Sequence, residues 1–256
     1  MPNFSDLLDK VKTMNNISEY NEVQNLVLKE EYLNKNLVIS SPTSSGKTLC
    51  AEIFMLNTVL EKHKRCLFIS PLKALTSEHY TGFKRKYEKE FGLKIGISTG
   101  DLDSSSKYLE NYEIIFLTFE KLDSLIRHKA QWLYSCGLIV VDEIHNIDTD
   151  RGAILEITIV ELKQLIKDLQ IIGLSATIPN ARQLTEWLDA KLIYSEYRPV
   201  KLKKGVLFEG AISFNDDTKQ IEKGNSSIED IVLDTLKQNK QALIFMNSRK
   251  SAEVLS

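Results

Sequence analysis

Short apolar runs separated by helical segments recur along the chain up to residue 188. The runs lie at residues 37–40, 66–70, 94–98, 113–118, 138–142 and 170–174. Several of them are apolar at successive positions, which is typical of strands covered on both faces. Helical periodicity occupies residues 48–62, 72–89, 152–169 and 180–188. The alternation predicts right-handed crossovers and an α/β fold with a doubly wound, mainly parallel sheet, whose ligands bind at the carboxyl ends of the strands.

The pattern changes after residue 200. Residues 201–227 alternate only weakly and include glycines, which predicts a hairpin followed by a polar linker. A helix over residues 227–239 and a buried strand over residues 242–246 are predicted next, and few residues follow them. We therefore expect a first domain over residues 1–200, a hairpin and linker over 201–240, and the first strand and turn of a truncated second domain over 241–256.

The composition is that of a soluble globular protein, with 43% hydrophobic and 27% charged residues in a chain of 256. The net charge of −2 provides no overall basic field for a nucleic-acid partner, although a local row of phosphate contacts does not need one. Cys50, Cys66 and Cys136 are widely spaced and odd in number, so we expect reduced core thiols in an intracellular protein, without a zinc site or a disulfide. No apolar run approaches the ~18 residues of a membrane span, and charges near the N-terminus exclude a signal peptide.

The segment Ser41-Pro-Thr-Ser-Ser-Gly-Lys-Thr48 follows a predicted strand and opens a predicted helix, which is the setting of a phosphate-binding loop. Lys47 is expected to bridge the β- and γ-phosphates of ATP, and Thr48 to offer its hydroxyl to Mg²⁺. The residues whose backbone would surround the phosphates are Thr43, Ser44, Ser45 and Gly46. Because Ser41 stands where many such loops have glycine, a serine-rich turn remains the simpler alternative.

An acidic pair, Asp142 and Glu143, follows the buried run at residues 138–141. Asp142 is expected to hold Mg²⁺ directly or through water, and Glu143 to orient and deprotonate the attacking water. The alternative is an ordinary acidic pair at a strand end. The phosphate loop at the end of another parallel strand makes that alternative less favourable. No second His or Cys stands at metal-ligand spacing from His145, so a zinc site is not predicted.

The sequence Asp142-Glu-Ile-His145, together with Ser175-Ala-Thr177, resembles motifs II and III of the superfamily 2 DExH helicases. Further segments resemble the Ski-like branch, and most closely the archaeal Hjm-type repair helicases and their helicase-Q relatives. These segments are residues 71–75, 98–101, 118–128, 151–156, 173–180, 186–188 and 197–202. The resemblance implies a RecA-like ATP-binding domain, a second RecA-like domain across the ATP, and 3′-to-5′ movement along one strand of DNA.

The resemblance also implies two further groups of site residues. Those expected to face the nucleic-acid backbone are Pro71, Leu72, Lys73, Thr99, Gly100, Asp101, Thr118, Glu120 and Lys121. Those expected to couple the nucleotide site to strand movement are His145, Ser175, Ala176 and Thr177. Contacts of this kind follow phosphates without reading bases. The alternative interpretation is that these residues belong to ordinary loops or helix caps, and that the lysines are only solvated.

Gln24 stands where the family places a glutamine that reads adenine, through an amide able to pair with N6 and N7 of the base. The usual pattern has a proline ahead of this glutamine, and this sequence has none. An exposed helix glutamine is the alternative interpretation.

Residues 241–250 resemble motif IV, and the arginines expected to reach the γ-phosphate from the second domain are absent. Because such an arginine contributes about 10³–10⁵ in rate, we expect this chain alone to bind ATP but to hydrolyse it very slowly and not to unwind a duplex.

Three functions remain open from the sequence. A DNA helicase of replication-fork repair is favoured, with a Ski-like RNA helicase and a nucleotide-gated binding module without turnover as alternatives. The expected cofactors are ATP and Mg²⁺, and the expected partner is single-stranded or forked DNA, or RNA in the alternative, with no membrane. The motor is expected to be monomeric, and to work in the cytoplasm on the nucleoid of an archaeon or in the nucleus of a eukaryote.

Overall fold

The computed structural model describes residues 3–100, 107–149, 152–177, 180–221 and 226–255. The chain divides into two compact units, Met1–Pro199 and Val200–Ser256. Only the first unit contains the predicted phosphate loop and acidic pair.

The first unit is built on one seven-stranded sheet in the order β3-β4-β2-β5-β6-β1-β7, in which all neighbouring strands are parallel. The strands are β1 (Leu37–Ser40), β2 (Arg65–Ser70), β3 (Ile95–Ser98), β4 (Ile114–Thr118), β5 (Cys136–Val141), β6 (Gln170–Ser175) and β7 (Lys191–Tyr194). All but β7 lie at the predicted runs, so the predicted α/β class with its parallel sheet is confirmed. β7 lacks a continuous apolar run because it is an edge strand in which only Ile193 is buried.

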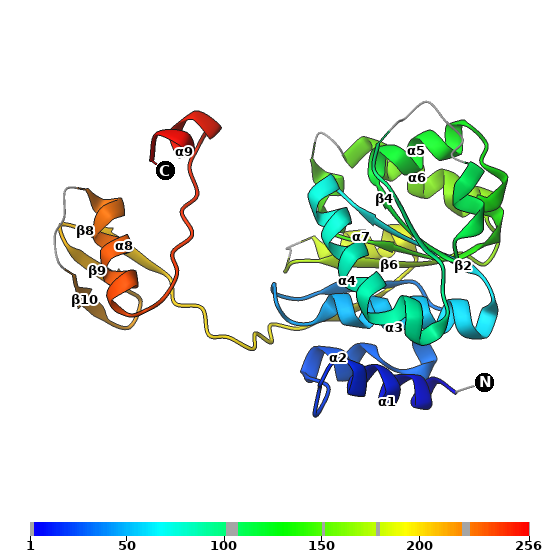
Figure 1. The fold of residues 1–256 in the computed structure, drawn as a ribbon, viewed down its shortest axis with the longest axis horizontal. Helices are drawn as coiled ribbons and strands as arrows, with labels where there is room; N and C mark the ends of the chain where they lie inside the picture. The colour runs from blue at the N-terminus through cyan, green and yellow to red at the C-terminus, as the bar shows by residue number, and fades with distance from the viewer. Residues whose placement is uncertain (1–2, 101–106, 150–151, 178–179, 222–225, 256) are drawn as a thin grey trace. The chain divides into compact units, whose positions relative to one another are not determined.

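Helices cover both faces of this sheet (Figure 1). One face carries α1 (Phe4–Met14), α2 (Glu22–Val27), α3 (Lys47–Lys62) and α4 (Lys73–Phe91), and the other carries α5 (Phe119–Arg127), α6 (Gly152–Leu165) and α7 (Ala181–Leu188). Short 3₁₀ helices lie at η1 (Glu30–Tyr32), η2 (Lys107–Asn111), η3 (Gln131–Ser135) and η4 (Ile144–Asp148). Within the described ranges, no helix is both long and apolar enough to cross a membrane.

Two hydrophobic cores lie on opposite sides of the sheet because successive strand residues point to opposite faces. In β1, Leu37 and Ile39 belong to the core under α3, and Val38 belongs to the core under α5 and α6. This arrangement explains why the strands are apolar at successive positions.

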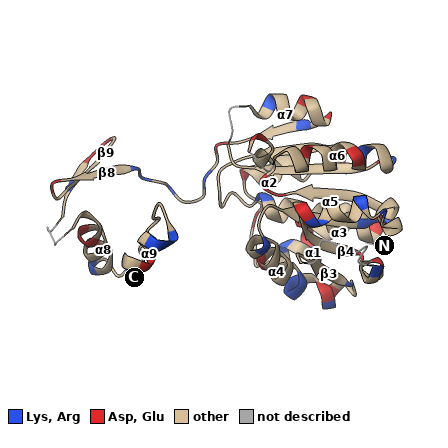
Figure 2. Cartoon of the chain, turned by 90° about the horizontal axis from the view of Figure 1, so that it is seen from above, with Lys and Arg blue, Asp and Glu red and all other residues tan. Residues whose placement is uncertain are grey.

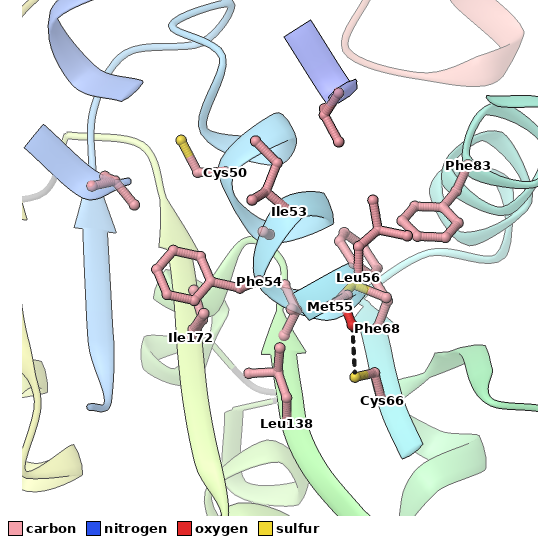
Figure 3. Packing of buried hydrophobic residues seen from close by; sticks show 14 of the residues in the cluster. Cys50, Ile53, Phe54, Met55, Leu56, Cys66, Phe68, Phe83, Leu138 and Ile172 are labelled. Atoms are coloured by element: carbon pink, nitrogen blue, oxygen red, sulfur yellow. Dashed lines mark hydrogen bonds between the residues drawn. The ribbon is translucent and has the colours of Figure 1, made fainter. Parts of the chain in front are cut away.

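Helix α3 is buried from Cys50 to Val59 without interruption. One side packs on the sheet, where Phe54, Met55 and Leu56 lie among Phe68, Leu138 and Ile172 (Figure 3). Its other side is covered by α1 and α2, which are additional to the predicted helices. The three cysteines are free and buried, as predicted, and burial raises the pKa of Cys136 to about 12.

The second unit contains an antiparallel sheet of β8 (Gly205–Phe208), β9 (Ala211–Phe214) and β10 (Thr218–Gln220), followed by α8 (Ser227–Lys237) and α9 (Arg249–Leu255). The predicted hairpin and the helix from residue 227 are therefore present. The predicted buried strand at residues 242–246 is wrong: no strand is assigned there, and Leu243 and Phe245 are 80% and 85% exposed. Its apolar sequence suits a strand, but none of the described strands pairs with it.

The parallel direction of the main sheet gathers its outgoing loops at one edge. The phosphate loop follows β1, residues 71–72 follow β2, and residues 99–100 follow β3. Asp142 follows β5 directly, and Ala176 follows β6. The predicted functional residues that follow these strands therefore share the carboxyl edge of the sheet, where parallel α/β sheets bind their ligands.

Candidate functional site

The phosphate loop spans residues 41–46, between β1 and the start of α3 at Lys47. Gly46 adopts φ 85° and ψ 15°, in the left-handed region. A Cβ atom at this position would collide with Nε2 of Gln24, so the loop needs glycine for its backbone and for its neighbour. Ser41 fits the position where many such loops have glycine because its Oγ lies 2.7 Å from Oγ of Ser45, and both residues are buried.

Lys47 is the buried cation of this loop. Its Nζ donates to the carbonyl oxygens of Ser41 and Pro42 at 3.3 and 3.4 Å. Burial lowers the pKa of Lys47, while the negative charges of Glu143 and Asp142 oppose that shift. The Lys47 ammonium and the two carboxylates therefore interact electrostatically, as groups that share a phosphate site would.

Gln24 lies against the loop, and its side chain is only 6% exposed, so the alternative of an exposed helix glutamine is wrong. It forms a capping box at the start of α2: its Oε1 accepts from the backbone N of Asn21 at 3.0 Å, and its own N donates to Oδ1 of Asn21. The Nδ2 of Asn21 donates to the carbonyl of Ser45 at 2.9 Å. A hydrogen bond thus connects the start of α2 to the phosphate loop. Adenine recognition by Gln24 stays a prediction.

The acidic pair begins where β5 ends. The backbone N of Asp142 donates to the carbonyl of Ile69 at 2.8 Å, which extends the pairing of β5 with β2 by one residue. Asp142 is buried, and Glu143 is half-buried with φ 50°. This left-handed backbone turns the chain at Glu143 and starts η4.

His79 is a site residue that the sequence analysis missed. Its Nε2 lies 3.1 Å from Oδ2 of Asp142, and its ring centroid lies 4.8 Å from that of Phe68. His79 lies three residues after Thr76 and four before Phe83, both buried residues of α4, so the helical spacing could have placed it on the sheet side. The sequence alone did not show which partner it meets.

Of the residues predicted to couple nucleotide and strand movement, Ser175 contacts His145 directly. Nδ1 of His145 lies 3.3 Å from Oγ of Ser175 and 3.3 Å from Oε2 of Glu143. The carbonyl of Ala176 accepts from Oγ of Ser40 at 3.2 Å, and Thr177 is exposed. Motif II, motif III and the end of β1 are therefore joined by hydrogen-bonding side chains.

The oxygens at this edge suit Mg²⁺. Thr48 is half-buried at the start of α3 and offers a hydroxyl, and Asp142 offers a carboxylate at the end of β5. Mg²⁺ is commonly held by one or two protein carboxylates while water and substrate phosphates complete its octahedron. Among the described residues no group of three or more His, Cys, Asp or Glu is placed to hold a metal ion.

The predicted nucleic-acid residues divide into exposed and buried sets. Leu72 is 51% exposed, Lys73 and Gly100 are exposed, and Thr99 and Glu120 are half-buried. Asp101 lies outside the described residues. Pro71 is buried beside Leu72.

The prediction that Thr118 and Lys121 face a nucleic-acid backbone is wrong for this structure, because they are 3% and 1% exposed. Both belong to the start of α5, where Oγ1 of Thr118 accepts from the backbone N of Lys121 at 3.3 Å as the helix cap. A helix that begins directly at Phe119 turns Lys121 toward the protein instead of leaving it in a loop.

Basic and acidic residues are mixed along two helices of the first unit. Lys and Arg are interspersed with Asp and Glu along α4 and α6 (Figure 2). A nucleic-acid contact would therefore depend on individual loop residues and backbone groups rather than on a broad basic patch.

Comparison with known proteins agrees with this geometry. The family model described as DEAD/DEAH box helicase matches residues 21–185, a range that contains Gln24, the phosphate loop and both helicase-like motifs. The chain is 44% identical over 227 residues to the ATP-dependent DNA helicase Hel308 of Methanocella arvoryzae, and covers 30% of that protein with 87% of its own length. It is 47% identical over 220 residues to the protein of the same name from Pyrococcus abyssi, with 86% and 30% covered.

The chain thus spans about a third of the length of these relatives. Among solved structures, the crystal structure of the DUF1998 helicase MrfA matches 98% of this chain and 39% of its own, with a TM-score of 0.75 and 22% sequence identity. That likeness shows the fold.

Proposed function

The chain belongs to the DEAD/DEAH box helicase family, and from that premise we propose that it is the ATP-binding part of an ATP-dependent DNA helicase. The proposed protein hydrolyses ATP with Mg²⁺ and moves 3′ to 5′ along single-stranded DNA at replication forks under repair. The DNA substrate is supported by the relatives at 44% and 47% identity, which are named as DNA helicases.

The observation that carries this proposal is the convergence of Lys47, Asp142 and Glu143 at one edge of the sheet. Lys47 begins α3, which follows β1, whereas the acidic pair follows β5, and the charges of both acids act on the Lys47 ammonium. One cation and two carboxylates brought together from separate strands are the parts that phosphoryl transfer requires.

In the proposed reaction, Lys47 binds the β- and γ-phosphates, and the loop N–H groups at the start of α3 bind their oxygens. A water oxygen forms a bond to the γ-phosphorus while the bond to the β–γ bridging oxygen breaks, which yields ADP and phosphate. Glu143 orients that water and takes its proton. Mg²⁺ held by Thr48 and Asp142 would neutralise developing charge on the phosphate oxygens.

His145 provides the proposed connection between this reaction and DNA movement. It lies 3.3 Å from both Oε2 of Glu143 and Oγ of Ser175, so it contacts the water-activating residue and motif III together. The DNA backbone would lie along the exposed residues Leu72, Lys73 and Gly100 at the same edge. Such a protein would act at the chromosome, in the cytoplasm of an archaeon.

The test is steady-state ATP hydrolysis by the full-length protein without nucleic acid, with single-stranded DNA and with single-stranded RNA of the same base sequence. Salt is fixed and low, because phosphate contacts weaken steeply as salt rises. Stimulation mainly by DNA is expected. Stimulation mainly by RNA would replace the DNA proposal with an RNA helicase, and turnover that neither polymer stimulates would favour a nucleotide-gated binding module.

A further inference from the structure

His79 contacts the acidic pair but belongs to none of the motifs that the proposed reaction uses. We propose that His79 is a positioning residue that holds one carboxylate oxygen of Asp142 and thereby presents the other oxygen to the Mg²⁺ that accompanies ATP. This inference rests on the proposed function and adds a residue from α4 to its cation site.

The contact has a defined direction. Nε2 of His79 lies 3.1 Å from Oδ2 of Asp142. An ionised carboxylate only accepts hydrogen bonds, so Nε2 carries the proton and donates it. With Oδ2 bound in this way, the carboxylate cannot rotate freely about its Cβ–Cγ bond, and Oδ1 keeps one direction. Hydrogen bonds of this kind orient metal ligands in other metal sites.

Both partners of this hydrogen bond are anchored on β2. The imidazole of His79 packs on Phe68, with 4.8 Å between ring centroids, and Phe68 is itself 1% exposed. The backbone N of Asp142 donates to the carbonyl of Ile69, the next residue of β2, at 2.8 Å. Because Phe68 and Ile69 are consecutive in a central strand, the positions of the imidazole and the carboxylate are fixed relative to each other.

The helix that carries His79 is also firmly seated. Phe83 and Tyr87, one and two turns later on α4, are buried against the core, and the ring of Phe83 lies 5.6 Å from that of Phe116 on β4. A donor on a packed helix is held more precisely than a donor on a loop, which is what positioning requires.

His79 lines the same cleft as Thr48, the other expected Mg²⁺ ligand. An open cleft between α3 and α4, about 690 Å³ in volume, is lined by both Thr48 and His79. Charged groups along this cleft are Glu52, Glu78, Arg85 and Lys86, and Lys86 is paired with Glu52 at 3.2 Å. The imidazole therefore lines the same cleft as Thr48 and also contacts Asp142, the two residues that would share a cation.

A purely structural histidine would make the same contact, so the experiment must separate cation binding from folding. The quantity to measure is the affinity of the 256-residue chain for a fluorescent, non-hydrolysable ATP analogue, at rising free Mg²⁺ and in EDTA. His79→Leu removes the donor and keeps an apolar group on Phe68. His79→Gln keeps an N–H donor, and His128→Leu removes an exposed imidazole elsewhere.

We expect His79→Leu to raise the Mg²⁺ concentration for half-maximal analogue binding by about 10–100-fold, the usual loss when a residue supporting a metal ligand is removed. Affinity in EDTA should change less than about twofold, because Lys47 and the loop N–H groups do not depend on His79. His79→Gln should recover most of the Mg²⁺ dependence, and His128→Leu should match the unmodified chain.

The results that would overturn the inference are specific. If His79→Leu folds and its Mg²⁺ requirement is unchanged, His79 does not position a cation ligand. An equal loss of affinity in EDTA and in Mg²⁺ would show a structural role instead. If the unmodified chain binds the analogue without any dependence on Mg²⁺, the proposed Mg²⁺–ATP function itself fails, and the His79 inference fails with it.

A spectroscopic measurement on the unmodified chain covers the case in which His79→Leu does not fold. The chain has four histidines, so their imidazole ¹⁵N signals can be assigned by single substitutions. We expect Mg²⁺ added to the analogue-bound chain to shift the Nε2 signal of His79, and not that of His128. An unshifted His79 signal at saturating Mg²⁺ would contradict the proposal.

Discussion

At the scale of single residues, Gly46 is constrained both by its backbone and by a neighbouring side chain. Gly46 and Gly92 both have positive φ, at 85° and 64°, but a Cβ at Gly46 would collide with Gln24 whereas nothing lies within 4 Å of one at Gly92. Alanine at either site incurs the left-handed strain of about 1–2 kcal/mol. We expect Gly46→Ala to destabilise the chain more than Gly92→Ala in urea unfolding, and only Gly46→Ala to weaken ATP-analogue binding, by at least about tenfold. Equal effects would show that Gln24 simply moves aside.

Glu143 provides the sharpest residue-scale test of the proposed chemistry. Glu143→Gln keeps the size of the side chain but removes the group that accepts the proton of water. A general base contributes about 10²–10⁴ in rate, so turnover by the full-length protein should fall by that factor while ATP binding stays within about threefold. Glu186→Gln, an exposed change on α7, is the matched control. Normal turnover by Glu143→Gln would assign water activation to another residue.

The sequence predicts some of these residues and not others for a physical reason. Lys47, Thr48, Asp142 and Glu143 could be found because their spacing follows a strand end, and parallel strands bring their ends to one edge. His79 could not be assigned a partner, since that contact joins two elements distant in the chain. The prediction for Lys121 came from the family resemblance, which does not show that α5 begins at Phe119 and buries this side chain.

At the scale of elements, the buried carboxylate of Glu52 joins three helices. The hydroxyl of Tyr87 on α4 donates to Glu52 on α3 at 2.8 Å, Lys86 lies 3.2 Å from the same oxygen, and Asn15, just after α1, donates to the Tyr87 oxygen at 3.1 Å. This network fixes α1 and α4 on either side of α3.

Tyr87→Phe should therefore lower the free energy of unfolding by about 1–3 kcal/mol, because a buried carboxylate oxygen loses one donor. Tyr80→Phe is the matched control: its oxygen accepts from Lys84, a partly exposed group that water can solvate, and a change within about 0.5 kcal/mol is expected. Urea unfolding measures both variants. If the two lose equal stability, the Glu52 network does not hold the helices together.

Strands were predictable where both faces of the sheet are buried, because burial on both faces requires apolar residues at successive positions. The central strands are apolar at successive positions and were all predicted, but β7 has only Ile193 buried and leaves no such signal. Helices α1 and α2 lie outside the alternation of strand and helix, although the capping boxes at Asn3 and Asn21 mark their first turns. The residues at 242–246 have the composition of a strand, yet β structure also needs a partner to receive its hydrogen bonds.

At the scale of the whole molecule, the connection between the two units is exposed and carries several basic residues. Arg198, Lys201, Lys203 and Lys204 are exposed and belong to no helix or strand. Trypsin does not cleave the Arg198–Pro199 bond, so limited digestion should cut first after Lys201, Lys203 or Lys204. It should leave a stable fragment that ends at one of these lysines, which intact-mass spectrometry would identify. Early cuts between β1 and β6 would show that the first unit does not hold together as described.

The residues just before this connection are hydrogen-bonded to α2, near the phosphate loop. Oγ of Ser195 donates to Oε1 of Glu22 at 2.9 Å and accepts from the backbone N of Tyr197 at 3.0 Å. Glu22 begins α2, the helix whose Asn21 cap also binds the loop through Ser45. The trypsin fragment should therefore retain ATP-analogue binding, because all of these contacts lie before residue 198.

The two cores that share one sheet also set where this chain can change length over evolution. Inserting one residue in β5 would exchange the side chains of the two cores beyond that point, since each successive residue serves the opposite face. It would also turn the following Asp142 away from its present partners. An insertion in the connections at the opposite edge of the sheet, such as residues 128–135 before β5, alters neither alternation nor the strand ends. Relatives should therefore differ in length at that edge and keep the spacing from each central strand to its functional residue.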